Sequence, residues 1–199
     1  RCGVVSPDGL WIAVGDSAGA RIWDARSAKP VGTYLPHSAA TLSAAYSPDS
    51  RLLLTGSFDQ TARLWHVPSG LPAGAPLRHR FGVPVVAFSR DGRTAICGTY
   101  TGEVHLWDVA TGAPLGMPLQ AGGPPDALDL SPDNRRLLVL AQVIPQFQLW
   151  RTDWLADAPR PEELTRRVTL ASQRVVEPGG AVRPLTADEL LALRAESKP

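Results

Sequence analysis

A two-part sequence pattern occurs four times in this chain at nearly constant spacing. Each copy has a turn with Ser at its first position and Asp at its third, followed by an alternating strand that ends in Trp. The turns are Ser6-Pro7-Asp8-Gly9, Ser47-Pro48-Asp49-Ser50, Ser89-Arg90-Asp91-Gly92 and Ser131-Pro132-Asp133-Asn134, and the Trp residues are Trp23, Trp65, Trp107 and Trp150. The turn Ser recurs after 41, 42 and 42 residues, and the Trp after 42, 42 and 43. Such a period indicates stacked units that bury their hydrophobic faces against their neighbours.

The second copy shows what one unit contains. Turn residues separate a strand of small residues over 42–46, an apolar run over 52–55 and an alternating stretch over 61–65. A fourth, edge-like strand is expected at 76–78, where a proline is tolerated. Each unit is therefore predicted to be a four-stranded antiparallel meander, with units near 1–36, 37–78, 79–120 and 121–151. Only Gly3-Val4-Val5 precedes the first turn, so the chain is expected to begin inside a unit and the first unit to be incomplete.

Composition limits the class of protein. Hydrophobic residues make up 44% of the chain and charged residues 20%, as in a globular protein, and the net charge is +1. This charge is too balanced for nucleic-acid binding, which needs a dense basic face. No stretch approaches the roughly 18 to 20 apolar residues of a membrane span. We therefore expect no nucleic acid and no membrane segment in this chain, and a cytoplasmic location. Cys2 and Cys97 show no pairing pattern, and Cys97 is interpreted as a small buried hydrophobe.

The four in-phase copies of turn plus Trp resemble the WD-repeat β-propeller family over roughly residues 3–151. The resemblance implies an all-β fold. We expect a partial WD-repeat propeller of about three and a half four-stranded antiparallel blades, with a short α-helical C-terminal tail over 152–199. Because a propeller hides the apolar face of each blade against the next, upstream blades or self-association are expected to be needed to close the ring.

The family also places a His ten residues before the turn Ser and an Asp six residues before the Trp. His37 and Asp59 occupy these positions in the second unit. The other units depart from the pattern. The third unit has His79 at the His position but Thr101 at the Asp position. The first unit has Ser17 at the Asp position, and the fourth has Ala121 and Ile144 at the His and Asp positions. The resemblance therefore implies a complete set only in the second unit.

In WD-repeat proteins the carboxylate orients the imidazole, the imidazole meets a hydroxyl, and the hydroxyl meets the Trp indole N–H. The implied members here are His37, Asp59, Trp65 and the hydroxyl of Thr55 or Ser57, with His79 and Trp107 in the third unit. Such a network satisfies buried polar groups. A hydroxyl, an imidazole and a carboxylate can also form a hydrolase site. Because no oxyanion donors are evident, we interpret the cluster as structural.

The chain shows no pattern of a metal, cofactor or catalytic site. Its histidines, which are His37, His66, His79 and His105, lack the spacing of metal ligands. The repeated turn aspartates fall on four separate units and are explained by turn chemistry. We therefore predict that this chain is not an enzyme, holds no metal and needs no cofactor.

A candidate protein-binding rim follows from the repeat. One period separates Phe58 from Tyr100, and in the family these turns lie on one rim of the propeller, with Arg78, Arg80 and Phe81 beside them. Aromatic residues and Arg are enriched at the cores of protein interfaces. The alternative is that these are scattered loop residues.

After Arg151 the sequence pattern changes. A helix is expected over 161–175, with Pro161 at its first position, and a second helix over 186–196 after an extended link over 182–184. The apolar face of the first helix would comprise Leu164, Val168, Ala171 and Val175. The run over 170–193 resembles the C-terminal extension of planctomycete-type WD-repeat proteins, which often follow a serine/threonine protein kinase domain. This chain itself holds no kinase motif.

The sequence thus predicts a non-catalytic WD-repeat segment that acts as a protein–protein interaction scaffold, with a partner whose identity the sequence does not give. The alternative is the C-terminal sensor or regulatory region of a bacterial serine/threonine protein kinase whose catalytic domain lies upstream. A hydrolase is the third hypothesis.

Overall fold

The computed structural model describes residues 2–131, 133–141, 147–152, 174–176 and 182–184. The chain divides into two compact units, Arg1–Asp153 and Trp154–Pro199. In the first unit, the described strands form four antiparallel sheets, and each sheet is a meander in chain order. The expected all-β arrangement of antiparallel sheets is therefore confirmed, and three of these sheets have four strands among the described residues.

The bounds of the strands follow the repeat. The first sheet comprises β1 (Gly3–Val5), β2 (Trp11–Gly15), β3 (Gly19–Asp24) and β4 (Pro30–Pro36). The second comprises β5 (Thr41–Tyr46), β6 (Leu52–Ser57), β7 (Thr61–His66) and β8 (Leu77–Arg78). The third comprises β9 (Val85–Phe88), β10 (Thr94–Gly98), β11 (Glu103–Asp108) and β12 (Leu119–Gln120). The fourth comprises β13 (Pro125–Leu130), β14 (Arg136–Ala141) and β15 (Phe147–Arg151).

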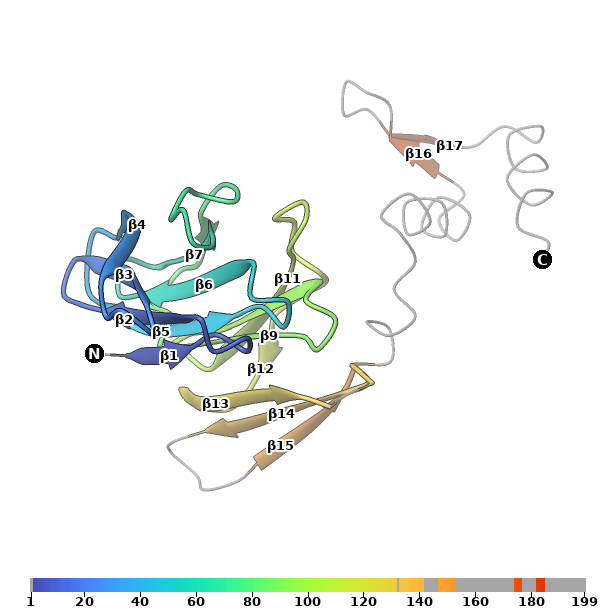
Figure 1. Cartoon of the computed structure of the whole chain (residues 1–199). Helices are drawn as coiled ribbons and strands as arrows, with labels where there is room; N and C mark the ends of the chain where they lie inside the picture. The colour runs from blue at the N-terminus through green and yellow to red at the C-terminus, as the bar shows by residue number, and fades with distance from the viewer. Residues whose placement is uncertain (1, 132, 142–146, 153–173, 177–181, 185–199) are drawn as a thin grey trace. The chain divides into compact units, whose positions relative to one another are not determined.

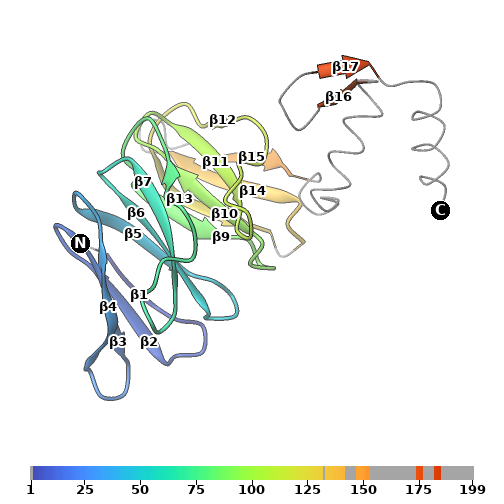
Figure 2. The same ribbon diagram turned by 90° about the horizontal axis from the view of Figure 1, so that it is seen from above.

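Consecutive sheets lie side by side, as Figures 1 and 2 show. Their first strands are neighbours, since β1 contacts β5, β5 contacts β9, and β9 contacts β13. Backbone hydrogen bonds also join the sheets. The N–H of Thr41 donates to the carbonyl of Asp16, and that of Val83 to the carbonyl of Ser57, both over 2.9 Å. Equivalent residues therefore join the first sheet to the second and the second to the third in the same way.

The Ser-x-Asp turn has the same hydrogen bonds in every sheet. In the second sheet, the Ser47 hydroxyl donates to the Asp49 carboxylate over 2.6 Å and accepts the backbone N–H of Leu52 over 2.9 Å. The Asp49 carboxylate also accepts the N–H of Arg51 over 3.1 Å. These bonds replace backbone partners that the tight turn cannot supply, which is why Ser and Asp recur there.

Hydrophobic side chains fill the space between the sheets. Ala13 and Ile22 of the first sheet lie in one cluster with Leu53 and Trp65 of the second, and none of the four is more than 1% exposed. A second cluster joins the second and third sheets in the same way, through Leu54. Since each sheet buries one face against the next, a single unit could not hold this core alone.

One glycine in each of the first three sheets lies against the beginning of the next sheet. A Cβ on Gly56 would lie only 2.7 Å from the carbonyl oxygen of Val83, and one on Gly15 or Gly98 would meet Thr41 or Pro125. In the fourth sheet the equivalent position holds Leu140, which is 42% exposed. If another sheet packed against the fourth sheet in the way that the second packs against the first, it would collide with the Leu140 side chain.

The unit that lacks a strand is not the one expected. The first sheet has all four strands, because three residues, Gly3–Val5, suffice to pair with β2. The first strand is short, since it comprises only three residues before the first turn, but the prediction that the first unit is incomplete is wrong. In the described residues it is the fourth sheet that has three strands. Apolar side chains are exposed on both end sheets, including Val5 and Val14 on the first and Leu138 and Leu149 on the fourth. Closure of the ring stays a prediction.

In the second unit, β16 (Arg174–Val176) pairs antiparallel with β17 (Val182–Pro184). The predicted helix therefore does not extend to Val175, and the segment 182–184 is a paired strand and not a free link. The β-branched pair Val175-Val176 favours a strand, and Pro178-Gly179-Gly180 follows it in the sequence. The rest of the predicted first helix and the whole of the second lie outside the described residues.

Candidate functional site

The second sheet contains a buried polar network of four side chains. His37 follows β4 and Thr55 lies on β6. Asp59 lies in the turn after β6, and Trp65 is the second-last residue of β7. The Trp65 indole N–H donates to the Thr55 hydroxyl over 2.8 Å, and this hydroxyl lies 2.8 Å from His37 Nε2. His37 Nδ1 lies 2.9 Å from the Asp59 carboxylate. The hydrogen bonds form one chain from the indole to the carboxylate.

The electrostatics fix the direction of these bonds. Burial lowers the pKa of His37, although Asp59 opposes the shift, so the imidazole is neutral near pH 7. Burial raises the pKa of Asp59, but hydrogen bonds from Thr61, the Ser38 N–H and His37 outweigh it and bring this pKa to about 2. A neutral imidazole then donates from Nδ1 to the carboxylate, and its Nε2 accepts the Thr55 hydroxyl proton.

Of the two hydroxyls considered from sequence, Thr55 belongs to the network and Ser57 does not contact its imidazole. The Ser57 hydroxyl donates to the carbonyl of Ala40 over 2.9 Å and accepts the N–H of Asp59 over 3.1 Å. Ser57 therefore holds the Asp59 turn in place. Thr55 is 0% exposed, so no substrate reaches its hydroxyl in this structure.

The third sheet brings together the same aromatic residues without the hydrogen bonds. The His79 and Trp107 rings lie 5.4 Å apart in an edge contact, but both ring nitrogens of His79 and the Trp107 indole nitrogen are buried without a hydrogen-bond partner. Cys97 takes the register position of Thr55, since it pairs with His105 as Thr55 pairs with Arg63. Burial, with a smaller contribution from His105, lowers the pKa of His79 to about 3. Two substitutions, Cys97 for Thr and Thr101 for Asp, therefore account for all three unsatisfied nitrogens.

Restoring both residues should stabilise the third sheet. We expect the double variant Cys97→Thr/Thr101→Asp to raise the free energy of unfolding by about 1 to 3 kcal/mol, because buried donors and acceptors gain partners. The increases in the free energy of unfolding of the two single variants should add up to less than that of the double variant, since both residues act through one imidazole. Urea unfolding followed by Trp fluorescence measures all three. A double variant less stable than the parent would contradict this account.

The predicted rim is assembled around a stacked aromatic pair. The rings of Phe58 and Tyr100 lie 5.2 Å apart at an interplanar angle of 19°. These residues occupy the same turn of neighbouring sheets, after β6 and after β10. They remain 52% and 38% exposed, so the pair bridges two sheets and still faces solvent. A Cβ on Gly82 would lie 3.2 Å from each ring, so this glycine allows the rings to close over the backbone.

The other rim residues lie between Phe58 and Tyr100 in the sequence, and all of them are exposed. Phe81, beside Gly82, is 46% exposed. Arg78 at the end of β8 and Arg80 in the following loop are also exposed. The structure brings the Phe58 and Tyr100 rings together. Backbone pairing places the arginines beside them, since Arg78 pairs with Thr61 and Arg80 lies two residues before Gly82, which the two rings cover.

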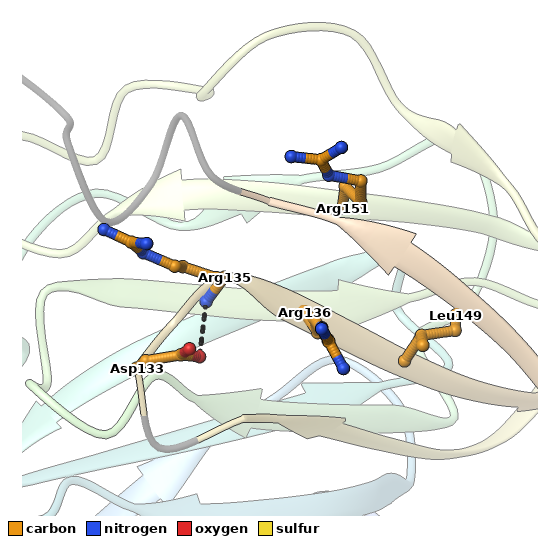
Figure 3. Close-up of a pocket in the computed structure, with 5 residues that line it drawn as sticks. All are labelled: Asp133, Arg135, Arg136, Leu149 and Arg151. Carbon is orange, nitrogen blue, oxygen red and sulfur yellow. Dashed lines mark hydrogen bonds between the residues drawn. The ribbon is translucent and has the colours of Figure 1, made fainter.

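A depression that sequence reasoning did not single out lies at the other end of the fourth sheet. It has a volume of about 650 Å³ and is lined, among the described residues, by Asp133, Arg135, Arg136, Leu149 and Arg151 (Figure 3). Asp133 accepts the backbone N–H of Arg135 over 3.0 Å, as the turn aspartates do in the other sheets. The signal available in the sequence was three arginines within 135–151.

Within the residues that the structure describes, no group of three or more His, Cys, Asp or Glu side chains is placed to hold a metal ion. In the same part of the chain, no helix has the length and apolar character needed to cross a membrane.

Comparison with known proteins gives a family resemblance for part of the chain. Residues 28–66 and 77–108, fewer than half of the total, match the family model described as WD domain, G-beta repeat. Each matched segment begins near the last strand of one sheet and continues through three strands of the next. A search of curated proteins finds no significant match.

Among solved structures, the chain is similar to Kuenenia stuttgartiensis hydrazine synthase. The TM-score is 0.68 at 15% sequence identity, and the similarity covers 76% of this chain but only 45% of that one. At this identity the similarity concerns the fold alone. The two comparisons and the sheet arrangement support a partial β-propeller built from WD-type repeats.

Proposed function

We propose that this chain is a WD-repeat scaffold that binds a partner protein through the rim formed by Phe58, Tyr100, Phe81, Arg78 and Arg80. The observation that carries the proposal is the stacked, solvent-facing pair of Phe58 and Tyr100. Rings held in one place bind with little loss of conformational entropy, and aromatic residues are frequent anchors of protein interfaces. The match to WD-type repeats supports the same class of function.

The buried network supports a structural role in place of catalysis. Its imidazole and hydroxyl resemble part of a hydrolase triad, yet the side chain of His37 is 0% exposed and that of Asp59 6%. All hydrogen-bonding atoms of the chain from Trp65 to Asp59 are already engaged within the sheet. The network therefore acts on function by holding the Asp59 turn, and with it the adjacent Phe58, at a fixed place on the rim.

Substitution of the stacked pair tests the proposal. Phe58→Ser/Tyr100→Ser is expected to weaken capture of partner proteins by at least tenfold, since loss of anchor residues typically costs 2 kcal/mol or more at an interface. The measurement is quantitative cross-linking and mass spectrometry with the purified chain in a lysate of the source cells. The free energy of unfolding should fall by about 1 to 3 kcal/mol, because the stack and the half-buried area of both rings are lost. Capture is therefore measured on a variant that circular dichroism shows to be folded.

Leu71→Ser provides a matched control. Leu71 is 56% exposed, as apolar as Phe58, and follows the turn after β7 at the end away from the rim. Capture of the same partners should not change in this variant. If both variants lose the same partners, or neither does, the rim is not the binding surface.

A further inference from the structure

The rim carries unbalanced positive charge beside its aromatic pair. Arg78 and Arg80 are exposed, and the described residues provide no ion pair for either guanidinium. They are the sequence neighbours of His79, and because the His79 side chain is buried, it holds the backbone of both arginines in place. A partner that brings carboxylates to this place would meet two cations that form no ion pair within the described residues.

Two acidic side chains of the second and third sheets make hydrogen bonds within their own sheets. The Asp59 carboxylate accepts hydrogen bonds from His37, the Ser38 N–H and Thr61, and its side chain is 6% exposed. The Glu103 carboxylate lies 3.2 Å from His105. Neither carboxylate forms an ion pair with Arg78 or Arg80 among the described residues, so both guanidinium groups stay open to a partner.

From this arrangement we infer that the rim takes an acidic, extended segment of a partner protein, with an aromatic or branched apolar side chain between its carboxylates. The apolar side chain would pack on the exposed faces of Phe58, Tyr100 and Phe81, and the carboxylates would bind Arg78 and Arg80, whose planar fork suits a carboxylate. This inference rests on the proposed function and adds the chemistry of the partner.

A single-stranded nucleic acid would also use aromatic and arginine side chains. The chain as a whole favours a peptide, because its net charge of +1 gives no extended basic track for a phosphate backbone. A surface made of two arginines and three aromatic rings is large enough for a few residues of a peptide.

The test is a selection with the complete 199-residue chain from a random dodecapeptide library displayed on phage. Enriched peptides should combine Asp or Glu with Phe, Leu or Ile, and Phe58→Ser/Tyr100→Ser should abolish their enrichment. Arg78→Glu/Arg80→Glu should weaken a synthetic copy of the most enriched peptide by about tenfold or more and shift a fresh selection toward Lys and Arg. Binding of that peptide should weaken as salt rises.

Arg26→Glu/Lys29→Glu is the matched charge control. Both residues are exposed and lie in the turn between β3 and β4, and the double variant changes the net charge by the same amount. It should bind the acidic peptide as the parent does. Equal weakening in both charge variants would show a non-specific field and would overturn the inference.

The remaining outcomes separate the two proposals. Peptides that depend on Phe58 and Tyr100 but show no acidic bias would overturn the inference and leave the proposed function standing. A selection in which no peptide depends on these rings would overturn both. Tighter binding of a labelled twelve-nucleotide thymidine oligomer than of the acidic peptide, at the same salt, would identify the ligand as nucleic acid and overturn the inference.

Discussion

Thr55→Val is expected to lower the free energy of unfolding by roughly 2 to 6 kcal/mol. The substitution keeps the shape of the side chain but leaves two buried groups, His37 Nε2 and the Trp65 indole N–H, without their partner, and each such group costs about 1 to 3 kcal/mol. Urea unfolding measures the loss. Trp65, which is 1% exposed, reports it by fluorescence.

Thr41→Val separates the hydrogen bonds from the threonine itself. Thr41 is 1% exposed, and its hydroxyl is buried without a hydrogen-bond partner. Replacing an unpaired buried hydroxyl with a methyl group should leave stability unchanged or raise it slightly. If Thr41→Val and Thr55→Val cost the same, the network does not stabilise the second sheet through its hydrogen bonds.

Gly56→Val is expected to cost about 3 kcal/mol or more, because the new side chain collides with the third sheet. Its Cβ would lie 2.7 Å from the Val83 carbonyl oxygen and 2.9 Å from the Val86 side chain. Extra atoms in a packed interior typically cost 1 to 3 kcal/mol, and a clash with backbone costs more than one with a flexible side chain. Thermal and urea unfolding both measure the effect.

A graded series keeps this prediction testable if the Val variant does not fold. Gly56→Ala should also destabilise, by less than Val, while Gly74→Ala should be nearly neutral, because a Cβ on Gly74 has no neighbour within 4 Å. Similar stabilities for Gly56→Ala and Gly74→Ala would show that the sheets do not approach as closely as described.

Much of the second sheet could be predicted from the sequence. The Ser-x-Asp turns are local, so the bonds from Ser47 to Asp49 follow from residues two apart. The pairing of His37 with Asp59 was implied by the family resemblance, although 22 residues separate them. The choice between Thr55 and Ser57 could not be made from sequence, because their side chains lie on the same face of β6 and only the place of the imidazole distinguishes them.

The tail shows where local signals mislead. A helix over 161–175 rested on spacing and a favourable first turn, yet Arg174–Val176 pairs with Val182–Pro184. Strand pairing depends on a partner that periodicity within one segment does not reveal, and a pair of β-branched valines then favours the strand.

The sequence by itself determined the repeat, the turns and the all-β class, because each depends on residues close together in the chain. The tertiary structure decided how neighbouring units meet. The stack of Phe58 on Tyr100 exists only because two sheets present the same turn side by side. The need for glycine at position 56 arises from the segment before β9, whose Val83 carbonyl comes 27 residues later. The distances between units depend on how the sheets pack, and the sequence of one unit alone does not determine them.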